Sequence, residues 1–317
     1  MKKVLVLGAG GFIGASLVNH LHKNGYEVTA FDKRPIPGLL EKLHVRWFSG
    51  DFLTSGDIEQ LIEKNEFDII YHLVATKLPA SSNLDPVGDC LENVVSSLRL
   101  LEAIRKKNNM PRFVFISSGG TVYGASKHFE PIQEYEATDP ICAYGISKLV
   151  IEKYLYMYHA AWDLDYIVLR LSNPYGEYQV LNSNQGIINV AISNALSGQP
   201  LEIWGDGEIT RDFIYIEDVL KAMVNAGTLP VSSRVVNIGS GKATTINEVL
   251  TVVMRSLPVK LDIVYKPARN VDVKYNVLNI GLASEVLSWR PEVTLELGIK
   301  KIVDFYLRYF KDIRQND

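Results

Sequence analysis

The chain has 317 residues, of which 47% are hydrophobic and 22% are charged, and its formal net charge at pH 7 is −3. This length is enough to bury the core of one large domain or two unequal ones, and the composition is that of a globular protein in water. The small negative charge excludes binding to nucleic acid or anionic membrane through bulk electrostatics. Any anionic ligand must therefore be held by a few placed cations and backbone amides.

Cysteine usage and hydropathy indicate the setting of the protein. Cys90 and Cys142 are too few for a disulfide framework, and their spacing does not suggest a metal site. No apolar run reaches about 18 residues, so we expect no membrane span. These features fit a cytoplasmic protein without a metal.

The first half of the chain alternates short apolar runs with amphipathic stretches. The expected strands are Val4–Leu7, Glu27–Phe31, Ile69–Leu73, Arg112–Ile116 and Tyr166–Leu171, and the expected helices are Ile13–Asn24, Asp57–Lys64, Asn93–Lys106 and Ala143–His159. Strands separated by helices are typical of right-handed βαβ units. The pattern predicts an α/β fold with a doubly wound parallel sheet.

After Asn173 the pattern becomes irregular, and prolines and glycines become more frequent. We therefore divide the chain near Leu171. Residues 1–171 are expected to form the sheet domain, and residues 172–317 a smaller mixed α/β region with some segments returning to the first domain. No internal repeat or long linker separates the two parts, so we expect them to pack as one unit.

A glycine-rich turn, Gly8-Ala9-Gly10-Gly11-Phe12-Ile13-Gly14, joins the first strand to the first helix. Glycines at 8, 11 and 14 allow a tight turn, close approach to a pyrophosphate and close helix–sheet packing, while the helix N-terminus offers free N–H groups. Asp32 ends the second strand, where a carboxylate accepts hydrogen bonds from ribose hydroxyls and repels a 2′-phosphate. Lys33 and Arg34 weaken that repulsion. The motif predicts a Rossmann-type domain that binds NAD in preference to NADP.

Tyr144 and Lys148 are four residues apart on a predicted helix, so their side chains share one face. A nearby ammonium stabilises a phenolate and lowers the tyrosine pKa toward the range useful for proton transfer. Such pairs are common on helix surfaces. What distinguishes this one is the hydroxyl-rich segment Ser117–Gly124, which follows a strand at the sheet edge where ligands bind. Together they predict a proton-transfer site.

These motifs resemble the extended short-chain dehydrogenase/reductases, and within them the nucleotide-sugar epimerases typified by UDP-glucose 4-epimerase. The resemblance extends nearly end to end. Further segments that carry it are Asp51-Phe52, His72-Leu73-Val74-Ala75, Ser117–Gly124, Arg170–Gly176, Gly205–Tyr215, Pro267–Arg269 with Asp272, and Leu287–Pro291.

The resemblance implies which residues contact each ligand. The implied NAD contacts are Gly8, Gly11, Phe12, Ile13, Gly14, Asp32, Asp51, Phe52, Leu73, Ala75, Asn93, Ser117, Tyr144 and Lys148. The implied contacts to a nucleotide sugar, with a UDP-sugar favoured, are Asn173, Arg211, Arg269, Asp272 and Asn276. It also implies a homodimer that pairs the helices expected at Asn93–Lys106 and Ala143–His159.

The resemblance further implies a mechanism. Tyr144, held as phenolate by Lys148 and the nicotinamide charge, takes a proton from a sugar hydroxyl while the carbon beneath passes hydride to NAD⁺. The transient keto sugar rotates and accepts the hydride on its other face. The expected reaction is epimerisation, at C4 of a UDP-hexose or UDP-N-acetylhexosamine.

The chain departs from the family in the loop after the strand at Arg112–Ile116. Gly119 stands where these enzymes usually carry the catalytic serine or threonine, so Ser118 or Thr121 is the candidate hydroxyl. We expect Gly119→Ser to be tolerated unless this position needs a positive φ. Gly120 and Thr121 replace the Asp-Glu of the related 4,6-dehydratases and cannot shuttle protons in that way, which disfavours dehydration. A keto-sugar reductase, a 4,6-dehydratase and a non-catalytic NAD-binding protein remain as alternatives.

Two further positions carry weaker predictions. Asn276 falls where a bulky tyrosine, in some members, walls off the sugar C2 substituent, so its shorter side chain leaves room for an N-acetyl group. The alternative is that Asn276 faces solvent on a loop. His72 ends a strand and is expected to be structural, and nothing near Cys142 would activate its thiol.

Overall fold

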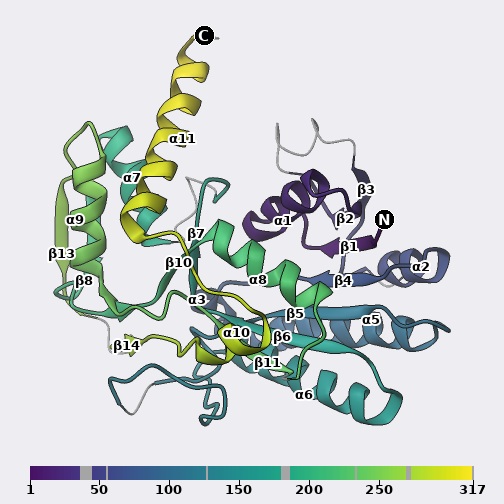
Figure 1. Ribbon diagram of the computed structural model, residues 1–317. Helices are drawn as coiled ribbons and strands as arrows, with labels where there is room; N and C mark the ends of the chain where they lie inside the picture. Colours follow the sequence, from purple (N-terminus) through teal and green to yellow (C-terminus); the bar gives the residue numbers. More distant parts are fainter. Residues whose placement is uncertain are drawn as a thin grey trace.

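The computed structural model of the protein describes residues 1–35, 45–54, 56–125, 128–179, 186–232, 234–268 and 273–315. Across these residues, seven parallel strands form one twisted sheet in the order β11-β6-β5-β4-β1-β2-β3 (Figure 1). The strands are β1 (Lys3–Leu7), β2 (Glu27–Asp32), β3 (Arg46–Ser49), β4 (Ile69–His72), β5 (Arg112–Ser118), β6 (Tyr166–Leu171) and β11 (Val235–Ile238). The strand order reverses between β1 and β4, and ligands bind at such a switch point.

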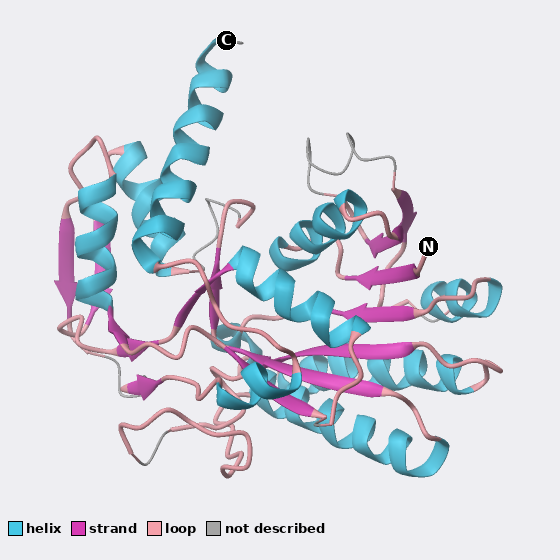
Figure 2. Cartoon of the chain, in the orientation of Figure 1, coloured by secondary structure: helices cyan, strands magenta, loops and turns pink. Residues whose placement is uncertain are grey.

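Helices cover both faces of the sheet, as Figure 2 shows, which explains why the central strands are almost continuously apolar. Helix α1 packs against α8, and α8 contacts β5 and β6; on the other face α2, α5 and α6 lie side by side. Their bounds are α1 (Phe12–Lys23), α8 (Ile216–Thr228), α2 (Asp57–Lys64), α5 (Ser96–Arg105) and α6 (Ala143–Trp162). The short helices α3 (Pro79–Ser82), α4 (Pro86–Asp89) and η1 (Cys90–Val95, a π-helix) lead into α5.

A smaller lobe lies beside the carboxyl ends of the sheet strands (Figure 1). Its strands form three short sheets, β10-β7, β12-β9-β14 and β13-β8, within the described residues. The strands are β7 (Asn173–Tyr175), β8 (Leu201–Trp204), β9 (Thr210–Arg211), β10 (Phe213–Tyr215), β12 (Thr244–Thr245), β13 (Ile263–Lys266) and β14 (Tyr275–Asn276). The helices are α7 (Ile187–Ser197), α9 (Ile246–Ser256), α10 (Gly281–Val286) and α11 (Leu295–Gln315). No helix in the described part of the chain is long and apolar enough to span a bilayer.

The predicted fold class is confirmed, and every expected strand and helix of the first half is present. Strand β3 was missed, because its four residues Arg-Trp-Phe-Ser lack an apolar run. The helix predicted to begin at Asn93 begins instead as η1, with the α-helical part starting at Ser96. Strand β11 lies beyond Leu171 and pairs with β6, so residues 1–171 alone do not complete the sheet.

Candidate active site

The glycine-rich turn lies where β1 enters α1 and allows two backbone segments to touch. A Cβ on Gly14 would lie 2.0 Å from the carbonyl oxygen of Gly8, so any other residue would force the helix away from the turn. Gly11 precedes α1 and provides no side-chain cap, which leaves the first N–H groups of the helix available to an anion. Phe12 and Ile13 form the half-buried start of this helix. The turn therefore has the form that pyrophosphate binding requires.

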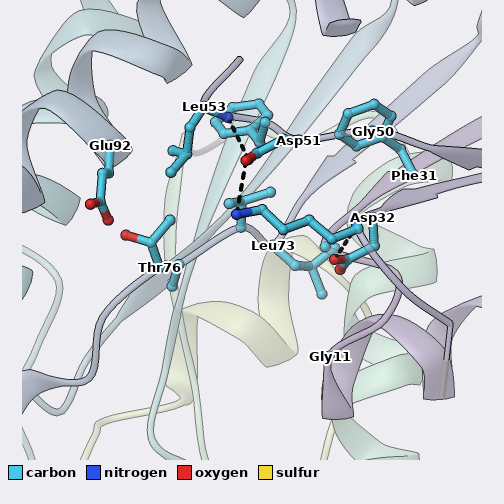
Figure 3. Close-up of a pocket in the computed structure, with 14 residues that line it drawn as sticks. Gly11, Phe31, Asp32, Gly50, Asp51, Leu53, Leu73, Thr76 and Glu92 are labelled. Carbon is cyan, nitrogen blue, oxygen red and sulfur yellow. Dashed lines mark hydrogen bonds and ion pairs between the residues drawn. The ribbon is translucent and has the colours of Figure 1, made fainter.

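A cavity of about 440 Å³ opens beside this turn, at the switch point of the sheet (Figure 3). Its size suits part of a dinucleotide. Seven of the predicted NAD contacts line it, namely Gly8, Gly11, Asp32, Asp51, Phe52, Leu73 and Ala75. The sequence analysis missed its other lining residues, which are Phe31, Lys33, Gly50, Leu53, Val74, Thr76 and Glu92.

Asp32 and Lys33 set the charge at the end of β2. The Asp32 carboxylate accepts hydrogen bonds from the backbone N–H groups of Gly10 at 2.9 Å and Lys33 at 2.6 Å. The Lys33 ammonium turns to Asp51, 2.9 Å from its Oδ2 atom. Because Lys33 is engaged there, it does not neutralise Asp32 directly, and the ribose contact predicted for Asp32 stays a prediction.

Helix α6 carries the predicted proton-transfer pair. The Lys148 ammonium is buried, donates to the carbonyl oxygens of Ile116 at 2.9 Å and Val74 at 3.4 Å, and lies 5.7 Å from the centre of the Tyr144 ring. Burial lowers the pKa of Lys148 to about 8, against the opposing charges of Asp89 and Glu152. The predicted convergence of the two side chains on one face is present.

The lowering of the Tyr144 pKa expected from the nearby Lys148 ammonium is absent. Burial raises the pKa of Tyr144 to about 12, with further increases from Cys142 and Asp89 that a hydrogen bond to Ser118 only partly offsets. The Lys148 ammonium donates to backbone carbonyls rather than to the phenol. The resting phenol is therefore neutral at neutral pH.

The loop after β5 distinguishes the two candidate hydroxyls. The Ser118 side chain lies near enough to Tyr144 to lower the pKa of its phenol, whereas Thr121 Oγ1 is buried with no hydrogen-bond partner among the described residues. Ser117, predicted to contact NAD, donates its hydroxyl to Glu152 at 2.5 Å inside the protein. Ser118 is thus the hydroxyl that acts on the proton-transfer residue.

Gly119 does not need a positive φ, but the space beside it is filled. A Cβ at this position would lie 2.5 Å from Leu278 Cδ1, and Leu278 is fully buried. Gly119→Ser therefore requires the Leu278 side chain to shift, and its tolerance stays a prediction.

The predicted substrate residues that the structure describes lie on short strands of the smaller lobe. Asn173 on β7 donates to the Asp212 carbonyl at 2.9 Å, and Arg211 on β9 pairs in register with Asn276 on β14. Asn276 is 1% exposed and its amide donates to the Gly119 carbonyl at 3.1 Å, which excludes the solvent-facing alternative. Arg269 and Asp272 lie outside the described residues.

The surroundings of His72 and Cys142 agree with the structural role predicted for His72 and the unreactive thiol predicted for Cys142. His72 is buried, its Nε2 atom lies 2.8 Å from Ser97 Oγ, and burial holds its pKa well below the usual value. Burial raises the pKa of the Cys142 thiol, so no thiolate is activated.

Comparisons with known proteins agree on one family. The model of the NAD dependent epimerase/dehydratase family matches residues 4–239. A putative UDP-glucose 4-epimerase of Methanocaldococcus jannaschii is 34% identical over 95% of this chain and 97% of that protein. The dTDP-4-dehydro-6-deoxyglucose reductase of Escherichia coli is 31% identical over 95% of this chain and 96% of its own length. The crystal structure of Thermotoga maritima UDP-glucose 4-epimerase with UDP-glucose superposes with a TM-score of 0.91 at 33% identity, covering 97% of this chain and 99% of that one.

Proposed function

The chain belongs to the NAD-dependent epimerase/dehydratase family, and from that premise we propose that it epimerises a nucleotide-activated sugar, at C4 of a UDP-hexose or UDP-N-acetylhexosamine. The observation that carries this proposal is the meeting of Tyr144, Ser118 and Lys148 beside the cofactor cavity. A proton acceptor, a bridging hydroxyl and an ammonium are the groups that reversible alcohol oxidation needs from the protein.

The cavity and the glycine-rich turn fit NAD. The free N–H groups of α1 would hold the pyrophosphate, and Asp32 the adenosine ribose. When bound, NAD⁺ supplies a positively charged acceptor that takes a hydride from the sugar and returns it.

The proton steps belong to the protein. Tyr144 removes the proton from the sugar hydroxyl and later returns it, with Ser118 relaying or orienting that hydroxyl. Because burial raises the pKa of Tyr144 to about 12, its loss of a proton needs positive charge beside the phenol, which favours the phenolate. Lys148 contributes part of that charge and fixes the geometry through its two carbonyl contacts.

The nucleotide sugar would be held across the smaller lobe. Arg211 and Arg269 suit the diphosphate through their planar, multi-donor groups, while Asn173 and Asp272 suit the neighbouring sugar and ribose hydroxyls. Asn276 is shorter than the tyrosine some relatives carry, which favours an N-acetyl group at C2. Wild-type protein should then turn over UDP-N-acetylglucosamine; failure to do so, with turnover of UDP-glucose, would reject this part of the proposal.

A second candidate is a keto-sugar reductase on the same scaffold. It is favoured by the similarity to the E. coli reductase, and both reactions use the same proton-transfer groups. The two differ in redox balance, because an epimerase regenerates NAD⁺ in each cycle and a reductase consumes NADH or NADPH. Steady loss of reduced cofactor with a dTDP-4-keto sugar would favour the reductase.

The test is to purify the protein, denature it and assay for released NAD, then incubate native protein with UDP-, dTDP- and GDP-sugars and follow them by NMR. The expected result is bound NAD and interconversion of one epimer pair without added cofactor. Tyr144→Phe, prepared in the same way, is the control for contaminating activity. No bound NAD and no interconversion would reject the proposal.

We also propose a homodimer formed through α5, α6 and the segment before them. Leu91, Ile146 and Met157 are 56%, 50% and 40% exposed, and the helices that carry them pack together. Covering such side chains favours association. Light scattering should give twice the 35.5 kDa of one chain, and Ile146→Glu should lower it to the monomer value. A wild-type mass of 35.5 kDa would reject the dimer.

A cytoplasmic location is the third part of the proposal. Both cysteines are free thiols, which suits a reducing compartment. Fractionation of the source cells should recover the protein with cytoplasmic markers, and recovery with the secreted fraction would contradict this.

A further inference from the structure

The start of helix α6 is held by side chains from elsewhere in the chain. Cys142 precedes the helix and gives it no side-chain cap. Instead, Asn83 Oδ1 accepts the N–H of Ala143 at 2.8 Å, and Ser82 Oγ accepts the N–H of Tyr144 at 3.0 Å. The segment that contains α3, α4 and η1 therefore fixes the turn that carries Tyr144.

Asp89, the last residue of α4, extends this contact one turn further along α6. It has no exposed surface, and its Oδ2 atom accepts a hydrogen bond of 2.5 Å from Ser147 Oγ. Ser147 immediately precedes Lys148 and follows Tyr144 by three residues. Because a buried carboxylate is costly unless its oxygens are hydrogen-bonded, this bond constrains both partners strongly.

The other oxygen of Asp89 connects to the cofactor cavity. Oδ1 accepts from Asn93 Nδ2 at 3.2 Å, and the same amide nitrogen donates to Thr76 Oγ1 at 3.1 Å. The Thr76 N–H in turn donates to Asn93 Oδ1 at 3.2 Å, and Thr76 lines the cavity. A continuous series of hydrogen bonds thus runs from the cavity wall through Asn93 and Asp89 to α6.

Among the charged groups near Tyr144 and Lys148, Asp89 is the one that lies near both residues. The charged and titratable groups near Lys148 are His72 from β4, Asp89 from α4 and Glu152 from α6, and those near Tyr144 are Cys142 and Asp89. His72 is neutral, and Glu152 is paired with Arg170 at 2.7 Å. Asp89 has no ion pair to a cation among the described residues, and it acts on both members of the pair.

We infer that Asp89 is a positioning residue for Tyr144 and Lys148, holding the first turns of α6 through Ser147 and joining them to the cofactor cavity through Asn93 and Thr76. This inference rests on the proposed function for its kinetic readout. Asp89 does not line the cofactor cavity, yet it keeps Tyr144 and Lys148 in position relative to the cofactor.

Two substitutions separate position from charge. Ser147→Ala removes the hydrogen bond but keeps the carboxylate, so kcat should fall roughly tenfold with KM nearly unchanged and with the pH profile in place. Asp89→Asn also removes the negative charge, and kcat should fall roughly ten- to a hundredfold. Since Asp89 raises the pKa of both Tyr144 and Lys148, both limbs of the Asp89→Asn pH profile should move to lower pH.

Asp85→Asn is the matched control. Asp85 begins the same α4 helix, is solvent-exposed and pairs with Lys77, so this variant should keep wild-type kcat, KM and pH profile. NAD affinity, measured on cofactor-stripped protein, gives a readout that does not depend on sugar turnover. It should weaken several-fold in Asp89→Asn and not in Asp85→Asn.

The outcomes are distinct. If wild type turns over no nucleotide sugar, the proposed function fails, and the NAD affinities alone decide the inference. If Asp89→Asn does not fold, Ser147→Ala carries the kinetic test. Two results together would overturn the assignment. Ser147→Ala would keep the wild-type kcat, and Asp89→Asn would keep either the wild-type pH profile or the wild-type NAD affinity.

Discussion

The cofactor cavity is walled by the ends of consecutive strands of one sheet, whereas the sugar side joins residues from two short sheets and a loop. On the cofactor side, Asp32 and Asp51 follow strands β2 and β3 within about twenty residues of each other. On the sugar side, Asn173 and Asn276 are more than a hundred residues apart in sequence and belong to two different short sheets, β10-β7 and β12-β9-β14. The first region depends on local backbone geometry, and the second on long-range packing around Gly119.

This difference separates variants that affect cofactor binding from those that affect the chemical step. The largest effect is expected at the point where the two regions meet. Tyr144→Phe should lower kcat by roughly two or more orders of magnitude, because it removes the proton acceptor. NAD content should stay near that of wild type, since no ribose or phosphate contact needs the phenol. Wild-type turnover in this variant would contradict the mechanism.

The next largest effect tests the cofactor region alone. Gly14→Ala places a methyl 2.0 Å from the Gly8 carbonyl, so the turn and α1 must separate. We expect loss of copurified NAD and a destabilisation of about 1–3 kcal/mol, measured by denaturant unfolding. Gly11→Ala is the matched control for packing, because its methyl would approach the same carbonyl only to 3.4 Å, so its free energy of unfolding should stay near that of wild type. Equal free energies of unfolding in the two variants would show that this close packing does not stabilise the turn.

A moderate effect is expected in the loop that faces the sugar. Ser118→Ala should lower kcat by roughly ten- to a hundredfold, because it removes the hydroxyl that lowers the pKa of Tyr144. Thr121→Ala should cost much less, since its hydroxyl has no partner among the described residues. Steady-state kinetics of the two variants give the comparison. The reverse order would assign the bridging role to Thr121, and full activity in both would remove this loop from the mechanism.

The smallest effect tests how long-range packing supports that loop. Asn276→Asp keeps the side-chain size but loses the amide donor to the Gly119 carbonyl, so kcat should fall roughly three- to tenfold with NAD content unchanged. Asn276→Leu, which also lacks the donor, serves as a second variant. Asn276→Tyr should lower turnover of acetylated sugars far more than turnover of plain sugars, because the ring would clash with the N-acetyl group alone. Unchanged kcat in both Asn276→Asp and Asn276→Leu would show that this contact does not position the loop.

The sequence predicts the cofactor region well because its signals are local. The spacing from Gly8 to Gly14, and the place of Asp32 at the end of a strand, already specify a turn and a ribose contact. Thr76 and Glu92 were missed because only the packing of the segment after β4 and of η1 brings them to the same cavity.

The catalytic loop was predicted less completely. Its candidate hydroxyls were identified from Ser118 and Thr121, but the sequence cannot distinguish them, since the distinction depends on which side chain reaches Tyr144. Leu278 and Asn276 come to Gly119 from more than 150 residues away, so neither the filled space beside Gly119 nor the buried amide follows from a motif. The neutral Tyr144 likewise follows from burial rather than from its spacing to Lys148.

The central claim is that the sugar is oxidised and reduced at one carbon by a cofactor that stays bound. The most direct measurement is NMR of a UDP-sugar deuterated at C4, incubated in ordinary water with the purified protein and no added cofactor. The account predicts interconversion of the C4 epimers with the deuterium retained, because the hydride returns to the carbon it left. Loss of the deuterium to solvent, or no interconversion of UDP-glucose or UDP-N-acetylglucosamine, would contradict it.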